Sequence, residues 1–263
     1  MQPPQMTRYE TRLVAFIDIL GFGSLIREST RDAGSEETVI ARIWEALTEA
    51  VAQVQRYSPQ SDSEDVRFSQ FSDSFVISAP VGDEVHHSLF YFSSSIQAIL
   101  DEMLRSRLFL RGGIAIGGLV HKDGLPFGPA MNRAYELETK VARVPRIVLD
   151  PAIPDLVTSR MQGLWATDTD GLRYLDYFYP GKAYYLIPGW LRAIQEAIEA
   201  LPPALELDEK RNWLISKYNT VVGGYLYDEF KRYLDDYMED GDNPAVARYY
   251  DELLADAIPL REL

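Results

Sequence analysis

Cysteine is absent from this 263-residue sequence, and histidine is scarce. Without cysteine the chain has no disulfide bonds, thiolate nucleophiles or thiolate zinc sites, and the absence fits a reducing compartment. The three histidines, His86, His87 and His121, do not share a metal-ligand spacing with carboxylates, so we expect them at the surface. This leaves the carboxylates as candidate metal ligands.

Long apolar runs and excess positive charge are also lacking. No window approaches the roughly 20 apolar residues that span a bilayer, and the N-terminal MQPPQMTRYETR has no apolar core for a signal peptide. The formal net charge of −14 argues against a binder of duplex nucleic acid or of anionic lipid. A nucleotide could still bind if metal ions or backbone amides neutralise its phosphates. We expect a cytoplasmic protein that binds neither nucleic acid nor membranes.

Hydrophobic periodicity predicts an α+β fold. Hydrophobic residues make up 46% of the chain, enough for a sizeable core. The pattern predicts strand 12–18, helix 35–57 with a Ser35 cap, strands 66–71 and 74–80, helix 85–104, strand 108–120, loop 121–130, helix 130–142 and strand 146–150. This order contains the ferredoxin-like βαββαβ pattern. We expect this core in a domain of residues 1–187, followed by a helical C-terminal extension, 188–263, packed on the core or on a dimer.

One carboxylate, Asp18, interrupts the apolar segment LVAFIDILGFGSLI. A charged group among buried strand residues is costly unless it is paired. In a ferredoxin-like core the tip of the second hairpin lies beside the carboxyl end of the first strand, which brings Asp73 next to Asp18. One or two bound Mg²⁺ or Mn²⁺ ions would make this carboxylate pair favourable.

The segment after Asp18 has the composition of a phosphate-binding loop. It has the sequence ILGFG and is expected to enter a helix, so its backbone N–H groups and the helix dipole could hold phosphates. Taken singly, an Asp at a strand end is more often a cap or turn former, and Asp73 alone would belong to the hairpin turn. The pair, the glycine loop and the strand order together favour phosphoryl chemistry on a nucleoside triphosphate.

Three spaced motifs, FIDILGF, FSDSFVI and RGGIAIGGLVHKDGLPFGPAMNRAYELE, resemble the class III nucleotide cyclase domain over about residues 12–150. The resemblance implies that Asp18 and Asp73 bind two Mg²⁺ or Mn²⁺ ions per site, with the Ile19 carbonyl as a further ligand. It implies a homodimer in which Asn132 of one subunit orients the ribose in the site of the other. The 3′-oxygen of that ribose would attack the α-phosphorus, and pyrophosphate would leave. The β- and γ-phosphates would be cradled by Leu20, Gly21, Phe22 and Gly23.

The sequence departs from the family at the transition-state arginine. That arginine follows the Asn by four residues, where this chain has Glu136. Arg133, Lys140 or Arg143 could substitute, and we favour Arg133. The departure leaves open a second interpretation, in which the domain is a cyclase-fold regulatory or binding module that has lost catalysis. The two filled Asp positions favour an active enzyme.

The positions that select a purine also differ from those of adenylyl and guanylyl cyclases. Ser69 stands where the family has Lys or Glu, and Leu125 stands where it has Asp or Cys. Neither can complete the hydrogen bonds of adenine or guanine, so a smaller base is expected. Arg67 and Arg111 could reach a pyrimidine carbonyl, although a solvated or packing role for Arg111 is an equal alternative.

A short domain with these three motifs and a helical tail resembles the pyrimidine cyclases of bacterial Pycsar antiphage systems. The resemblance implies synthesis of cyclic UMP or cyclic CMP as a second messenger for a separately encoded effector. We favour UTP over CTP as the substrate, although no residue decides between them. The sequence has no GGDEF-type motif, which argues against a diguanylate cyclase.

Overall fold

The computed structural model describes residues 8–31, 33–57, 65–153, 156–158, 161, 163–178, 187–201, 205–222 and 260. The chain divides into two compact units, residues 1–176 and 177–263. The sequence-based boundary between residues 187 and 188 stays a prediction. Most of the predicted extension falls outside the described residues.

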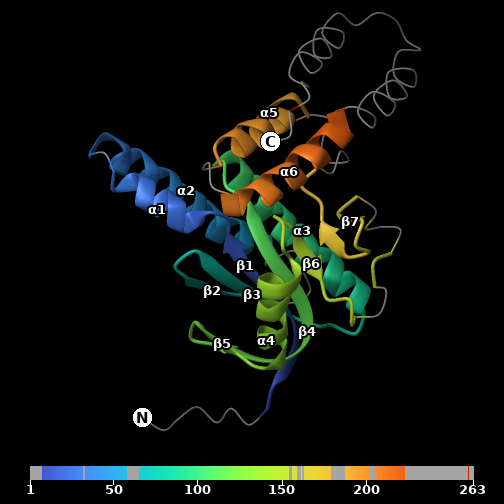
Figure 1. The fold of residues 1–263 in the computed structure, drawn as a ribbon. Helices are drawn as coiled ribbons and strands as arrows, with labels where there is room; N and C mark the ends of the chain where they lie inside the picture. The colour runs from blue at the N-terminus through green and yellow to red at the C-terminus, as the bar shows by residue number, and fades with distance from the viewer. Residues whose placement is uncertain are drawn as a thin grey trace, which may run out of the picture. The chain divides into compact units, whose positions relative to one another are not determined.

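The first unit contains a mixed sheet with helices on both faces (Figure 1). In its described part the strand order is β2-β3-β1-β4-β6-β8-β7, and β5 pairs with β4. The strands are β1 (Glu10–Ile19), β2 (Arg67–Phe71), β3 (Ser74–Pro80), β4 (Leu110–Lys122), β5 (Leu125–Phe127), β6 (Ile147–Leu149), β7 (Trp165–Thr167) and β8 (Arg173–Leu175). The helices are α1 (Phe22–Ser29), α2 (Ala33–Tyr57), α3 (Val85–Arg105), α4 (Pro129–Glu136) and the π-helical turn η2 (Leu137–Val141).

The first four strands confirm the predicted ferredoxin-like core. β1 lies between β3 and β4 and is antiparallel to both, and β2 is antiparallel to β3. Strands β1 and β2 are therefore parallel and separated by β3, which is the split βαβ arrangement. Strand β6 continues the sheet, parallel to β4. The α+β class predicted from periodicity is confirmed.

Strand β1 is the buried centre of this sheet. Its register runs from Arg12 opposite Pro80 to Asp18 opposite Ser74 on one side, and it pairs along its whole length with β4 on the other. Every residue from 12 to 17 is buried, because helices cover both faces. An apolar run of this kind is typical of a strand without a solvent-exposed face.

Helix α4 approaches β4 closely because β4 carries glycines beneath it. A Cβ on Gly113 would lie 2.7 Å from the carbonyl oxygen of Ala134 and would collide with the side chain of Leu137. Gly117 lies in the same way beneath Ala130, whose Cβ would be 3.4 Å from an added methyl group. The paired glycines in the sequence therefore mark a close helix–strand contact.

The second unit contains helices α5 (Ile187–Glu199) and α6 (Leu205–Thr220). Asn219 near the end of α6 exchanges two hydrogen bonds with the backbone of Leu260, at 2.7 and 2.8 Å. These helices agree with the helical character predicted for the extension. In the described part of the chain, no helix combines the length and apolarity needed to cross a membrane.

The structure corrects four details of the sequence analysis. Helix α2 begins at Ala33, so Ser35 lies inside the helix and is not its cap. The predicted loop 121–130 contains strand β5, because a left-handed turn at Asp123 and Gly124 folds the chain back on β4. Strands β7 and β8 were not predicted, and each has only three residues, too few to show a period. His121 is buried, with 1% of its surface exposed, and is not a surface residue.

Candidate functional site

Two carboxylates meet at the end of strand β1. Asp18 is the next-to-last residue of β1 and pairs in register with Ser74 of β3 and with Arg111 of β4. Asp73 lies in the two-residue turn between β2 and β3. The backbone N–H of Ile19 donates to the Asp73 carbonyl at 3.1 Å, which ties the turn to the strand end. The strand order therefore places the two predicted metal ligands side by side.

Negative charge accumulates around Asp18, whose side chain is only 22% exposed. Burial, followed by the charges of Asp73 and Glu138, raises the pKa of Asp18 to about 6. The Ser74 hydroxyl donates to Oδ1 at 3.1 Å and Nη2 of Arg111 lies 3.7 Å from Oδ2, and both contacts oppose the rise. The carboxylates of Asp18, Asp73 and Glu138 outnumber the guanidinium of Arg111 here, and this excess of negative charge favours a bound cation.

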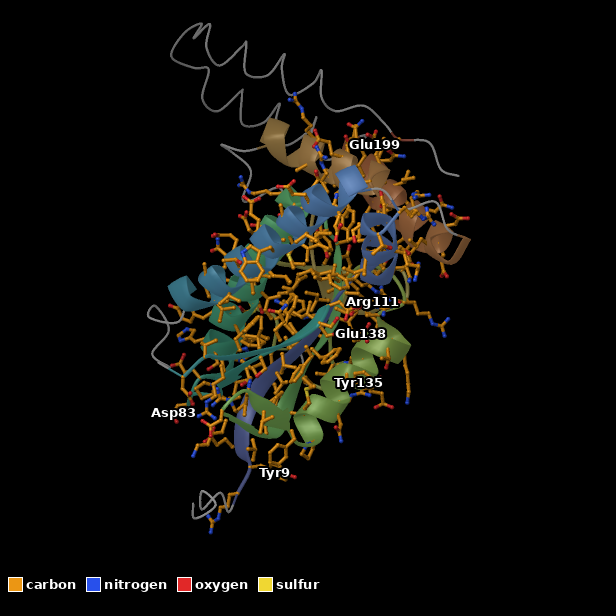
Figure 2. All side chains as sticks on the ribbon, turned by 90° about the vertical axis from the view of Figure 1, so that its left-hand side faces the viewer. Tyr9, Asp83, Arg111, Tyr135, Glu138 and Glu199 are labelled. Carbon is orange, nitrogen blue, oxygen red and sulfur yellow. The ribbon has the colours of Figure 1, made fainter. Side chains whose placement is uncertain are left out.

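Arg111 is held at this site by Glu138. The two form an ion pair, and the Glu138 side chain on η2 is 4% exposed (Figure 2). Glu138 was not among the predicted site residues, because it lies in a charged stretch that is typical of an exposed helix. A signal existed: Ala130, Ala134, Leu137 and Glu138 follow the i, i+4, i+7, i+8 spacing of one buried helix face.

The glycine loop forms the entrance to helix α1. Gly21 has φ 75°, a left-handed conformation that favours glycine, and its carbonyl accepts from the N–H groups of Ser24 and Leu25. The N–H of Leu20 donates to the Phe109 carbonyl at 2.8 Å, so it is already used. The first N–H groups of a helix have no partner within the helix and can bind an anion. Because the N–H of Leu20 is used, the anion-binding amides here are those that follow Leu20.

The predicted ribose-orienting and transition-state residues lie on α4. Asn132 is exposed on this helix. Arg133 makes two hydrogen bonds to Asp150, at 2.8 and 2.7 Å, and these bonds raise the pKa of Arg133. Glu136 is paired with Lys140 at 2.8 Å and with Arg133 at 3.3 Å. The side chain favoured as a substitute arginine is therefore bound by neighbouring carboxylates, and its catalytic role stays a prediction.

Of the four residues predicted to contact the base, three lie at the β4–β5 hairpin and Arg111 lies with the carboxylates. Arg111 lies with the carboxylates of Asp18 and Glu138. Arg67 on β2 is bonded to the carboxylate of Asp65 and to the backbone of the β4–β5 hairpin. The other two are at that hairpin: Ser69 is buried and Leu125 is 64% exposed.

The donor set fits Mg²⁺ or Mn²⁺ bound together with a substrate. Among the residues that the structure describes, no group of three or more His, Cys, Asp or Glu side chains could hold a metal ion. A metal at Asp18 and Asp73 would thus have two carboxylate ligands, and its other ligands would be carbonyl, water and phosphate oxygens. Magnesium is bound in this way, by one or two carboxylates plus substrate phosphates.

No protein-family model matches the sequence, and no curated protein matches it. Among solved structures, the adenylyl cyclase CyaB from P. aeruginosa is similar over 65% of this chain and 97% of its own, with 16% identity and a TM-score of 0.47. The catalytic core of a rhodopsin-guanylyl cyclase with converted specificity, in complex with ATPαS, is similar over 64% of this chain and 96% of its own, with 18% identity and a TM-score of 0.43.

Proposed function

We propose that this protein is a nucleotide cyclase that converts UTP into 3′,5′-cyclic UMP and pyrophosphate. The observation that carries the proposal is the juxtaposition of Asp18 and Asp73 at one strand end, next to the left-handed turn at Gly21 that opens helix α1. Excess negative charge beside a helix N-terminus suits a triphosphate that arrives with its divalent cations. The sequence motifs that resemble class III cyclases are centred on these same residues.

The proposed reaction is an intramolecular phosphoryl transfer. The ribose 3′-oxygen forms a bond to the α-phosphorus, the bond from that phosphorus to the β-phosphate oxygen breaks, pyrophosphate leaves, and the hydroxyl proton passes to solvent. Asp18, Asp73 and the Ile19 carbonyl would hold Mg²⁺ or Mn²⁺, two ions per site. Bound ions of this kind lower the pKa of a hydroxyl and neutralise triphosphate charge.

The remaining residues would bind and orient the substrate. The amides from Gly21 to Gly23 bind the phosphates at the positive end of the α1 dipole. The Arg111–Glu138 pair lies against Asp18 and fixes the position of its carboxylate. Asn132, exposed on α4, orients the ribose bound to the partner of a homodimer. Each site would then take its parts from two copies of the chain.

The proposed physiological role follows the resemblance to Pycsar cyclases. The product would be a second messenger in antiphage defence, detected by a separately encoded effector. The net charge of −14 supports a protein that acts on nucleotides and does not bind nucleic acid. CTP is the alternative substrate, since a site that lacks purine partners can take either pyrimidine.

A second candidate function is a catalytically inactive regulatory module with this fold. The observation that favours it is the carboxylate of Glu136 at the position of the family's arginine, together with the binding of Arg133 by Asp150. In such a module the nucleotide would bind at Asp18 and Asp73 without turnover.

The test is to incubate the purified protein with each of the four nucleoside triphosphates and Mn²⁺ and to identify the products by mass. We expect cyclic UMP as the main product of the wild type and none from Asp73→Asn. Asp83→Asn, an exposed aspartate beyond β3, is the matched control and should behave as the wild type (Figure 2). Nucleotide binding without any cyclic product would support the regulatory module, and a dominant cyclic AMP product would refute the pyrimidine assignment.

A further inference from the structure

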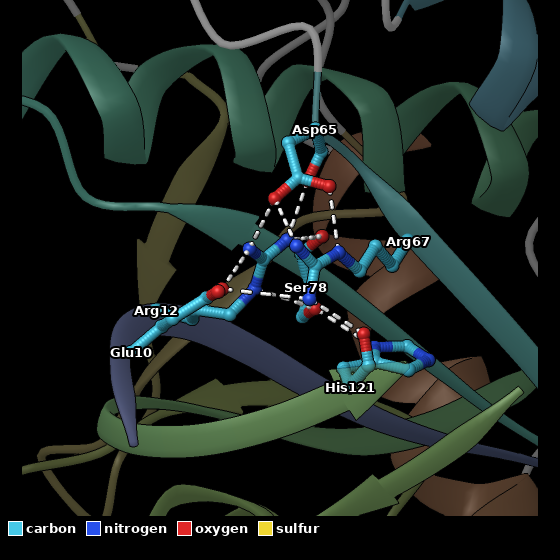
Figure 3. Close-up of polar contacts among 6 residues, drawn as sticks. All are labelled: Glu10, Arg12, Asp65, Arg67, Ser78 and His121. Carbon is cyan, nitrogen blue, oxygen red and sulfur yellow. Dashed lines mark hydrogen bonds and ion pairs between the residues drawn. The ribbon is translucent and has the colours of Figure 1, made fainter. Parts of the chain in front are cut away.

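A second polar cluster, with a buried centre and exposed carboxylates, lies on the same face of the sheet as Asp18, near the other end of β1 (Figure 3). Arg12 and Asp18 are separated by an even number of positions on β1, so both point to the face that carries α4. Arg12 is fully buried, as is His121 at the end of β4. The cluster is completed by Glu10, Asp65, Arg67, Ser69 and Ser78.

The hydrogen bonds of this cluster determine the tautomer of His121. Ser69 uses its hydroxyl proton to donate to the Gly124 carbonyl at 2.9 Å, so its oxygen accepts from Nε2–H of His121 at 2.8 Å. On the other side, Nε of Arg12 donates to Ser78 Oγ at 3.0 Å. The Ser78 proton therefore points to Nδ1 of His121, 2.8 Å away. In this series of hydrogen bonds each donor finds its own acceptor if His121 is neutral and carries its proton on Nε2. No other protonation state of His121 satisfies all of these donors.

The surroundings also keep His121 neutral. Burial, followed by the charges of Arg12 and Arg67, lowers the pKa of His121 to about 4, against the opposing charge of Asp65. A second proton on Nδ1 would remove the acceptor to which the Ser78 hydroxyl donates. The direction of the hydrogen bonds is thus fixed at neutral pH.

This chain of bonds attaches the β4–β5 hairpin to the edge strand β2. Ser69 of β2 bonds both His121 and Gly124, and Nη1 of Arg67 donates to the His121 carbonyl at 2.6 Å. Strands β2 and β4 are not neighbours in the sheet, because β3 and β1 lie between them. The hairpin therefore crosses the face of the sheet, and these side chains hold it there.

The role of Ser69 differs from the one expected from sequence. Its hydroxyl donates its only proton to Gly124 and accepts from His121, so this buried residue has no proton left to donate to a base. The carbonyl that accepts from Ser69 belongs to Gly124, the residue directly before Leu125. Leu125 itself is 64% exposed. Ser69 thus acts on the position of Leu125.

We propose that His121 and Ser69 are positioning residues that lock the β4–β5 hairpin across the sheet, so that the base is selected by the shape of this fixed wall at Leu125. The proposal rests on the proposed function, since it concerns the base subsite of that reaction. A rigid wall excludes the larger purines without any hydrogen bond to the base. A hairpin that moves would admit them.

Two conservative variants separate the two sides of the imidazole. In His121→Gln the amide nitrogen takes the place of Nε2 and can still donate to Ser69. In His121→Asn the shorter amide stays near the Nδ1 position and reaches Ser78 but not Ser69. Ser69→Ala removes the same link from the other end. The matched controls are His87→Gln and His87→Asn, at an exposed histidine on α3.

Hydrogen exchange of the hairpin peptide and the ratio of kcat/KM for UTP and ATP are measured on the full chain. We expect His121→Asn and Ser69→Ala to speed exchange in the hairpin and lower the UTP/ATP ratio, each about tenfold, as the loss of one buried hydrogen bond implies. His121→Gln should remain within about threefold of the wild type in both, because it keeps that bond.

The proposal would be overturned if His121→Asn had the same hairpin exchange rate and the same UTP/ATP ratio as the wild type. It would also be overturned if His121→Gln and His121→Asn lost protection and selectivity to the same extent. Nitrogen NMR of the wild type provides an independent test, since a proton on Nδ1 contradicts the bond directions. A wild type that turns over no nucleotide removes the proposed function and the selectivity claim together. The exchange data would still decide whether His121 locks the hairpin.

Discussion

Replacing Asp18 by asparagine should stabilise the metal-free protein. The native pKa of Asp18 is about 6 against an ordinary value of 3.8, so ionisation in the folded state costs about 2 pKa units. At 1.36 kcal/mol per unit this is ~3 kcal/mol at pH 7. Asparagine is isosteric, has no charge and keeps an oxygen that can accept from the Ser74 hydroxyl. We therefore expect Asp18→Asn to raise the free energy of unfolding by ~2–3 kcal/mol in EDTA.

The effect has a defined pH window. Because the folded pKa is raised, the protonated carboxyl of Asp18 is favoured by folding, and its contribution is fully present below the unfolded value of 3.8. It is lost as the pH rises to about 6 and does not change further above that pH. The stability difference between variant and wild type should therefore be small near pH 4 and reach its maximum above pH 6.

Metal should reverse the order of stability. A cation that binds only the folded wild type adds about 4.1 kcal/mol at a thousand times its dissociation constant, which exceeds the ~2–3 kcal/mol that the variant gains. Urea unfolding at pH 7 in EDTA and then with Mn²⁺ measures both effects, with the exposed Glu45→Gln as control. If Asp18→Asn is less stable than the wild type in EDTA, or if Mn²⁺ stabilises both equally, the charge argument for this site is wrong.

Three further predictions concern packing, burial and assembly. Gly113→Ala should cost ~1–3 kcal/mol in urea unfolding, because its Cβ would collide with Leu137. Arg146→Met should cost ~3–5 kcal/mol by the same measurement, because Arg146 is 4% exposed and its loss removes the ion pair with the equally buried carboxylate of Asp168. Asp73→Asn and Asn132→Ala should each be inactive alone, yet co-refolding them should return about a quarter of wild-type activity, since half of the dimers are mixed and have one intact site. No recovery in proven mixed dimers would place the whole site in one chain.

The ferredoxin-like core could be predicted because its main strands and helices are long enough to show a pattern. Strand β1 is a continuous apolar run, helix α3 carries apolar residues at helical spacing, and the tight turn at Asp73 fixes the hairpin. Strands β5, β7 and β8 could not be predicted, because each has only three residues and none has the uninterrupted β-branched and apolar sequence that indicates the equally short β6. Their place in the sheet depends on tertiary pairing with strands far along the chain.

The site could be predicted only as far as topology determines it. Strand order alone places Asp73 beside Asp18, whatever the side chains around them are. The Arg111–Glu138 pair depends on the close approach of η2 to β4, which in turn depends on Gly113. Such a contact needs the packed structure, because either charge alone has the sequence pattern of a solvated residue.

Two polar clusters on one sheet face thus differ in a way that separates structure from function. Around Arg12 and Arg67 the carboxylates of Glu10 and Asp65 balance the two guanidinium groups. Burial alone would raise the pKa of Asp65, but hydrogen bonds from Arg67 and Arg12 outweigh burial, and the pKa is lowered. Around Asp18 the negative groups outnumber the positive one and the pKa is raised. A balanced cluster is complete without a ligand, whereas the unbalanced one gains free energy from a cation, so the end of β1 is where substrate and metal should bind.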